Sequence, residues 1–176
     1  MRVKKINLIS LRNKILFRLI LPHGKYLRER FKILFTFVQY LIPKFNKDGK
    51  IMIYSPQKLY LNKKNLPLNK YGSGHFCKFS VNCPKDSGVY LWVVDKKIIY
   101  IGETKNLYKR FNNGYGHISP RNCYEGGQYT NCKMNKIVLK YFSRGKTIKL
   151  YFHATKKYKI LEQYLLNNFH TLFNEK

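Results

Sequence analysis

Two apolar runs dominate the start of the chain. They cover residues 15–21 and 31–42, and both are shorter than the roughly 20 apolar residues that a membrane-spanning helix needs. Apolar side chains recur there at steps of three and four, the spacing of one face of a helix. The pattern predicts a basic amphipathic helical extension over residues 1–46. Three partners for its apolar face stay open: the main domain, which is the commonest arrangement, a membrane surface, or a second protein.

Turn-forming residues interrupt this pattern in the next part of the chain. Asn, Asp, Gly, Pro and Lys cluster at residues 46–50, 55–56 and 72–74, and only residues 51–54 have the character of a short strand. We interpret residues 47–83 as a linker or an irregular subdomain.

The periodicity becomes sharper after residue 84. Residues 89–94 and 97–101 have the pattern of two antiparallel strands joined by a tight turn at residues 95–96. Alternation of apolar and polar side chains over residues 148–153 indicates a third strand.

Helical spacing separates and follows these strands. Thr104 or Asn106 caps a first helix, a second helix ends near Gly145, and a last helix starts at about residue 157. The order strand, strand, helix, helix, strand, helix predicts an α+β domain over residues 84–176. Its core would be a small three-stranded antiparallel sheet flanked by helices.

Two tyrosines occupy matching places in the predicted hairpin. Strand alternation puts Tyr90 and Trp92 on one face of the first strand, and Ile98 and Tyr100 on a common face of the second. The two phenols are therefore expected side by side on one face of the sheet. Each of them, taken alone, also fits an ordinary strand aromatic.

The charge balance narrows the class of partner. The chain has 35 Lys+Arg against 8 Asp+Glu, a formal net charge of +27, and the basic residues occur throughout its length. Such a molecule binds polyanions by neutralising phosphates and releasing counterions. Nucleic acid is the first candidate and an anionic membrane surface the second. Some of the 15 Tyr and 12 Phe could stack on bases, although most are expected in the core.

Cysteine usage points to a reducing compartment. The four cysteines form no CxxC pair and no secretory signal precedes them, so we expect an intracellular protein with reduced thiols. The first residues of the chain contain few acidic side chains, as organelle transit peptides do, so organelle targeting stays open. The spacing of Cys123 and Cys132, with His117 nearby, fits no strong zinc pattern, which favours buried thiols.

Several short motifs within residues 84–174 together resemble the GIY-YIG nuclease superfamily. The two halves of its signature are present, the first with Val in place of Ile. An Arg follows in the next helix, a Glu lies on the last helix, and an Asn closes the domain. In chain order these elements are Gly88-Val89-Tyr90, Tyr100-Ile101-Gly102, Arg110, Glu162 and Asn174. Residues 119–132 are similar to a stretch in a bacterial and phage branch of the family.

The resemblance implies a metal-dependent DNA endonuclease that hydrolyses phosphodiester bonds with one divalent cation, Mg²⁺ or Mn²⁺. Glu162 would hold the metal, and Arg110 would donate to a non-bridging phosphate oxygen. Tyr90 would orient or deprotonate the attacking water, with Tyr100 beside it. A phenol of ordinary pKa about 10 needs nearby cations to act as a base at neutral pH.

The remaining site residues follow the family pattern less closely. Members of the family often have a His one turn after the Arg, where this chain has Asn113 and Gly114. His117, in the following loop, would substitute for this His as a general base. His153 is a second-tier candidate for the site. The structural signature residues implied by the resemblance are Gly88, Gly102 and Asn174.

Other functions stay open on the sequence alone. The protein could be a nucleic-acid-binding module that no longer cuts, or a repair-type nuclease that needs a partner. A cutting enzyme would fit a mobile-element, phage or restriction setting. Double-strand cleavage would call for a homodimer or sequential nicking, and peripheral membrane contact by residues 1–46 is the less favoured alternative.

Overall fold

The structure is a computed structural model that describes residues 7–11, 14–23, 27–60 and 66–174. The chain forms two compact units. The first, which we call the sheet unit, comprises Met1–Gln39, Asp86–Lys105 and Lys149–Lys176. The second, the helical unit, comprises Tyr40–Lys85 and Asn106–Ile148. These boundaries do not coincide with those drawn from the sequence at residues 46 and 83.

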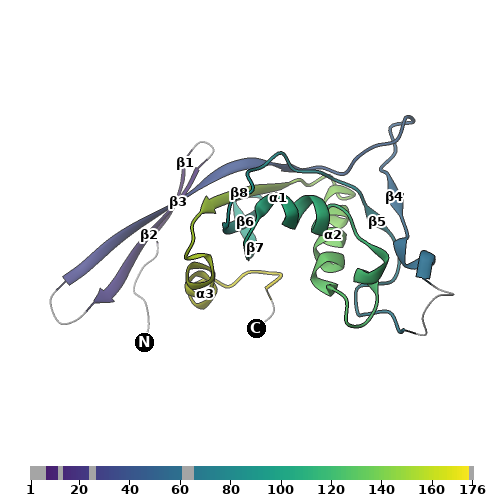
Figure 1. Ribbon diagram of the computed structural model, residues 1–176. Coiled ribbons are helices and arrows are strands. Elements are labelled where there is room, and N and C mark those ends of the chain that lie inside the picture. Colours follow the sequence, from purple (N-terminus) through teal and green to yellow (C-terminus); the bar gives the residue numbers. More distant parts are fainter. Residues whose placement is uncertain (1–6, 12–13, 24–26, 61–65, 175–176) are drawn as a thin grey trace. The chain divides into compact units, whose positions relative to one another are not determined.

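One sheet organises the sheet unit, and its strands are mostly antiparallel (Figure 1). The fold class, α+β, is confirmed, but the sheet is larger than the three strands predicted. Within the described ranges it has six strands, in the order β1-β2-β3-β8-β6-β7. Their bounds are β1 (Asn7–Leu11), β2 (Lys14–His23), β3 (Leu27–Leu41), β6 (Gly88–Val94), β7 (Lys97–Thr104) and β8 (Ile148–Ala154).

The predicted helical extension over residues 1–46 is wrong, because the described part of this segment forms β1, β2 and β3. In β3 the side chains of Ile33, Phe35 and Phe37 pack into the core, whereas Thr36 between them is exposed. Ile15 of β2 lies opposite Phe35 in the strand register. These apolar residues satisfy a period of two as well as a helical spacing, and pairing in a sheet decides between the two. The amphipathic helix proposed to contact a membrane is therefore absent from the described part of the segment.

The hairpin of β6 and β7 has the predicted turn. Asp95 and Lys96 both have positive φ, 48° and 66°, as a two-residue turn that matches the twist of the strands requires. The register contains a bulge between Trp92 and Val93, which sets Tyr100 opposite Trp92 but Ile98 opposite Val93. Ile98 and Tyr100 therefore lie on opposite faces, which corrects the prediction that they share one.

Helix α3 (Tyr158–Asn168) covers one face of the sheet. Its Leu165 is fully buried in a cluster with Val89, Leu91 and Ile101, which alternate with Tyr90 and Gly102 along β6 and β7. The start of this helix after Lys157 agrees with the prediction. The other face of the same strands carries the phenols.

The helical unit contains a small two-stranded sheet and several short helical segments. Its elements are β4 (Ile53–Tyr54), η1 (Pro56–Tyr60), β5 (Phe76–Cys77), α1 (Leu107–Lys109), η2 (Arg110–Tyr115), η3 (Pro120–Cys123) and α2 (Tyr129–Phe142). The segment interpreted as a linker is folded into this unit. The fully buried Asn135 of α2 accepts from the backbone N–H of Cys77 (3.0 Å) and donates to the carbonyls of Cys77 (2.8 Å) and Tyr115 (2.7 Å). Over the residues that the structure describes, none of the helices has the length and apolar character needed to cross a membrane.

Candidate active site

The two signature tyrosines lie next to one another on β6 and β7, as predicted. Tyr90 is opposite Gly102 in the register, and Tyr100 is opposite Trp92. The ring centroids of Tyr90 and Tyr100 are 6.2 Å apart with an angle of 43° between the ring planes. The Trp92 ring packs edge-on against Tyr100 at 5.8 Å, which restrains the second phenol.

Gly102 provides the space into which the Tyr90 ring extends. A Cβ atom at Gly102 would lie 2.5 Å from both Cζ and Oη of Tyr90 and 2.9 Å from Cε1 of Tyr100. The hydroxyl end of Tyr90 is therefore directly over the backbone of β7. Gly88 is equally constrained, because a Cβ there would collide with the His153 carbonyl oxygen and the Phe152 ring. Both signature glycines are thus required by close packing.

The outer edge of β7 is closed by the C-terminal segment. Asn174 Oδ1 accepts from the backbone N–H of Ile101 (2.9 Å), and its Nδ2 donates to the Ile101 carbonyl (2.7 Å). Thr171 Oγ1 donates to Asn174 Oδ1, and the Phe173 N–H donates to the Ile99 carbonyl (3.1 Å). Asn174 therefore acts on the strand that carries Tyr100, as a structural clamp.

Glu162 lies on α3 and is half-buried. Because α3 packs on the Val89 and Leu91 face, the helix is on the side of the sheet opposite to the phenols. In the described part of the sheet, β7 is the last strand. Groups from the two faces can converge only around such an edge, so a joint role for Glu162 and Tyr90 requires the carboxylate to reach the outer side of β7.

Arg110 belongs to the helical unit, at the start of η2. Its backbone N–H donates to the Asn106 carbonyl (3.0 Å), and Asn106 Oδ1 accepts from the Lys109 N–H (2.8 Å), so Asn106 is the predicted cap. The guanidinium carbon lies 5.7 Å from the centroid of the Tyr115 ring. This cation–π contact orients the side chain within its own unit. Its convergence with the phenols stays a prediction.

The two histidines singled out from the sequence have other neighbours. His117, also in the helical unit, is exposed and stacks on Tyr54 with centroids 6.2 Å apart. His153 lies opposite Val89 in the register, on the α3 face, with Nδ1 2.9 Å from the Leu34 carbonyl oxygen. The structure therefore does not bring His153 together with the phenols.

The donor set fits Mg²⁺ better than zinc. Among the described residues, no group of three or more His, Cys, Asp and Glu side chains could hold a metal ion. Glu162 is the only acidic residue in α3. A single carboxylate is a sufficient protein ligand for Mg²⁺, which keeps most of its waters, but not for a closed tetrahedral zinc site.

The predicted buried thiols are confirmed in the helical unit. The Sγ atoms of Cys123 and Cys132 are 3.9 Å apart, and both residues are fully buried. The hydrogen bond between them and burial raise the pKa of Cys132, while the same bond lowers the pKa of Cys123. Sequence reasoning missed the neighbouring Tyr54, whose hydroxyl accepts from the Ile118 N–H (2.6 Å); burial raises its pKa to about 12.

Comparison of the chain with models of protein families, with curated proteins and with solved structures finds no match in any of the three.

Proposed function

We propose that the protein is a metal-dependent DNA endonuclease of the GIY-YIG type, which hydrolyses phosphodiester bonds. The observation that carries the proposal is the phenol pair. Tyr90 and Tyr100 are adjacent, the Tyr90 hydroxyl lies over Gly102, and Asn174 clamps the same strand. The net charge of +27 supplies the attraction for DNA.

The phenols would act on the attacking water. Tyr90 is 1 % exposed, so packing holds its ring in place, and the proposal requires that the attacking water gain access to the hydroxyl when DNA binds. A hydroxyl in a fixed position can orient a water molecule for in-line attack and accept its proton when cations stabilise the phenolate. Tyr100, fixed by Trp92, would hold the other side of this water or of the phosphate.

The charged residues would bind the scissile phosphate. Arg110 offers planar donors to a non-bridging oxygen, which fixes the phosphate and balances the charge that develops on it. His117, in the loop after η2, would substitute for the general-base His of the family. Glu162 would hold the divalent cation, and this role requires its carboxylate to reach the phosphate around the outer edge of β7, because α3 packs on the face opposite to the phenols. The cation would supply charge neutralisation and assist the leaving oxygen.

Cleavage of supercoiled plasmid with Mg²⁺ or Mn²⁺ tests the proposal. We expect nicking by the wild type, loss of nicking in Glu162→Gln, and a reduction of about 100-fold or more in Tyr90→Phe, the range for removal of a general base. DNA binding should persist in both variants. Glu125→Gln removes one exposed carboxylate of the helical unit and serves as the matched control.

Two outcomes would contradict the proposal. If the purified wild type binds DNA but cuts none with either metal, the protein is a non-cleaving binding module. If Tyr90→Phe loses binding and cleavage to the same extent, Tyr90 has a structural role only. Cleavage that appears only on addition of a cell extract would indicate a repair-type nuclease with a partner.

A further inference from the structure

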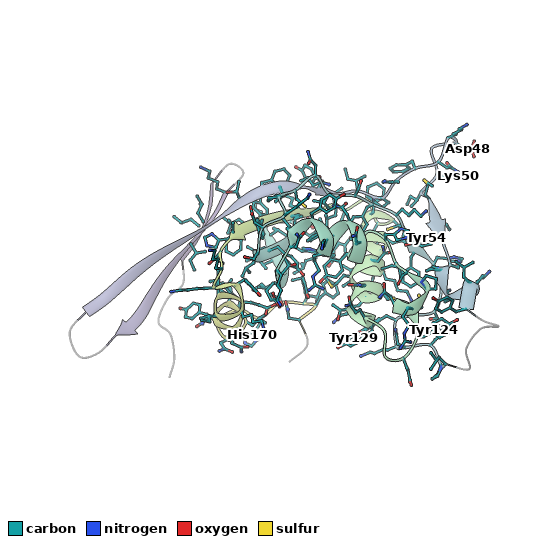
Figure 2. The ribbon with its side chains drawn as sticks, viewed as in Figure 1. Asp48, Lys50, Tyr54, Tyr124, Tyr129 and His170 are labelled. Carbon is teal, nitrogen blue, oxygen red and sulfur yellow. The ribbon has the colours of Figure 1, made fainter. Side chains whose placement is uncertain are left out.

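A second basic and aromatic surface lies on the helical unit, at the N-terminal end of α2. It is formed by Lys70 and Tyr71, which precede β5, and by Tyr129 and Lys133 on the first turns of α2. We call these four residues the tyrosine platform. Figure 2 labels Tyr129 at this end of the helix. The cleavage chemistry proposed above uses none of them.

The two tyrosines of the platform are stacked. Their ring centroids are 6.1 Å apart and the planes are inclined by only 19°. Tyr129 is 46 % exposed, so one side of its ring packs on Tyr71 and much of the remainder faces solvent. A flat exposed ring backed by a second ring is the arrangement on which a nucleobase can stack.

Two ammonium groups lie over the inner ring. Lys70 Nζ is 5.3 Å and Lys133 Nζ is 5.8 Å from the centroid of the Tyr71 ring. Two ammonium groups beside one ring give this end of the helix positive charge to which a phosphate can bind. The first turn of α2 contains no acidic residue, and the helix dipole adds positive potential there.

The platform is held by a framework built from the stretch that follows η2. Asn69 Nδ2 donates to the carbonyls of Asn122 (2.6 Å) and Tyr124 (3.3 Å), and the Asn69 N–H donates to the Cys123 carbonyl (2.9 Å). Asn69 Oδ1 accepts from the Tyr71 N–H (3.0 Å), which fixes the residue that carries the inner ring.

Gly72 adds a second constraint to this framework. A Cβ atom at Gly72 would collide with the backbone carbonyl of Cys123. The chain on either side of Tyr71 is therefore tied to η3 and the residues after it. Residues 119–132, which the cleavage proposal leaves without a role, position Tyr71 against Tyr129.

We propose that the tyrosine platform binds single-stranded DNA. A base stacks on the exposed side of Tyr129, and the ammonium groups of Lys70 and Lys133 neutralise the flanking phosphates. Duplex DNA keeps its base faces inside the stack, so it can use the lysines but not the ring. None of the four platform residues belongs to the proposed cleavage site, and binding to the platform requires no metal.

Fluorescence anisotropy of a labelled single-stranded oligonucleotide, in EDTA and with the full chain, tests this proposal. We expect Tyr129→Leu to weaken binding by about tenfold, the middle of the range for loss of one base–aromatic stack. Tyr129→Phe retains the ring and should bind like the wild type. Lys133→Gln should weaken binding and reduce its salt dependence. The same length of duplex should respond to Lys133→Gln but not to Tyr129→Leu.

The matched control is Phe45, which is 45 % exposed and packs edge-on against Phe142, the last residue of α2. Phe45→Leu removes an equally exposed ring about 20 Å along the helix from Tyr129, and should leave the affinity unchanged. Lys50→Ala, an exposed lysine of the same unit, controls for the loss of one charge.

Three results would overturn the proposal. Equal weakening by Phe45→Leu and Tyr129→Leu would show that the platform is not specific. Equal effects of Tyr129→Leu on single-stranded and duplex DNA would show that no base stacks on it. The third result is that the wild type binds an RNA of the same sequence about tenfold more tightly than the DNA and that Tyr129→Leu loses this preference. The platform would then be assigned to RNA. Because EDTA suppresses cleavage, failure of the nuclease proposal leaves this test unaffected, and Tyr90→Phe should bind the oligonucleotide normally.

Discussion

Substitution of Gly102 by alanine is the sharpest test of the phenol arrangement. The new Cβ would lie 2.5 Å from Cζ and Oη of Tyr90 and 2.9 Å from Cε1 of Tyr100. Ordinary carbon contacts are about 3.5–4.0 Å. The Tyr90 ring must therefore retreat by roughly 1 Å. At 1 % exposure the ring cannot retreat into solvent without moving its neighbours.

The change in the free energy of unfolding of Gly102→Ala is the balance of two opposing effects. Alanine restricts the unfolded chain more than glycine does, which favours folding by about 0.4–1 kcal/mol. Overpacking of a well-packed site costs about 1–3 kcal/mol. The net result is a loss of roughly 1–2 kcal/mol, which for a chain of this size lowers Tm by about 2–8 °C. Because a 1 Å misplacement of a reacting group costs about 100-fold in rate, cleavage should fall much further than stability alone explains.

Paired unfolding and cleavage measurements separate these effects. Gly49→Ala is the control, because Gly49 has φ of +73° and nothing within 4 Å of its added Cβ. It should lower Tm through backbone strain but leave the phenols in place, so plasmid cleavage below Tm should match the wild type. If Gly102→Ala melts and cuts like the wild type, the Tyr90 ring does not lie over Gly102 and the geometric argument fails.

Three further predictions concern stability. Asn174→Ala removes both hydrogen bonds to Ile101 and should cost about 1–3 kcal/mol in urea unfolding, whereas an unchanged midpoint would show that the clamp does not form in solution. Asn135→Ala removes three buried hydrogen bonds to the backbone of Cys77 and Tyr115, and we expect a loss of about 3 kcal/mol; a much smaller loss would mean that other groups or water replace the amide. Burial raises the pKa of Cys77 to about 12, so the folded state keeps a proton that the unfolded thiol releases near its ordinary pKa. The contribution of Cys77 to the free energy of unfolding should therefore be constant below about pH 8 and fall as the pH rises toward 12, so that the total falls less steeply in Cys77→Ala over this range; identical slopes would refute this assignment.

Local patterns predicted those parts of the fold that local chemistry determines. The β6–β7 hairpin follows from its apolar strands and the Asp95-Lys96 turn, and α3 follows from an apolar stripe that includes Leu161 and Leu165. The apolar residues of β2 and β3 fit a helix as well as a strand. Only the pairing of strands decides between these: β1, β2 and β3 pair with their sequence neighbours, and β8, which lies beside β3 in the sheet, comes from a distant part of the chain.

In the candidate site, too, local patterns predicted some features, whereas others depend on contacts between distant residues. Period-two alternation put Tyr90 and Tyr100 on one face, and the structure agrees. The bulge that moves Ile98 to the other face has no signal in the apolar pattern, because it is set by the pairing of two strands. The stacking of Tyr71 on Tyr129 joins distant residues through backbone hydrogen bonds, which side-chain periodicity does not encode.

The Asn174 clamp has a consequence for biosynthesis. Asn174 lies 73 residues after Ile101, so a ribosome completes β7 long before it delivers the group that closes the edge of this strand. Until then the nascent chain presents open backbone donors and acceptors next to Tyr100, to which another nascent chain could add a strand. Yield of correctly folded product should therefore depend on rapid docking of the segment that contains Phe173 and Asn174, and a bulky insertion directly after Asn174 should lower it more than the same insertion in the Asp48-Gly49 turn.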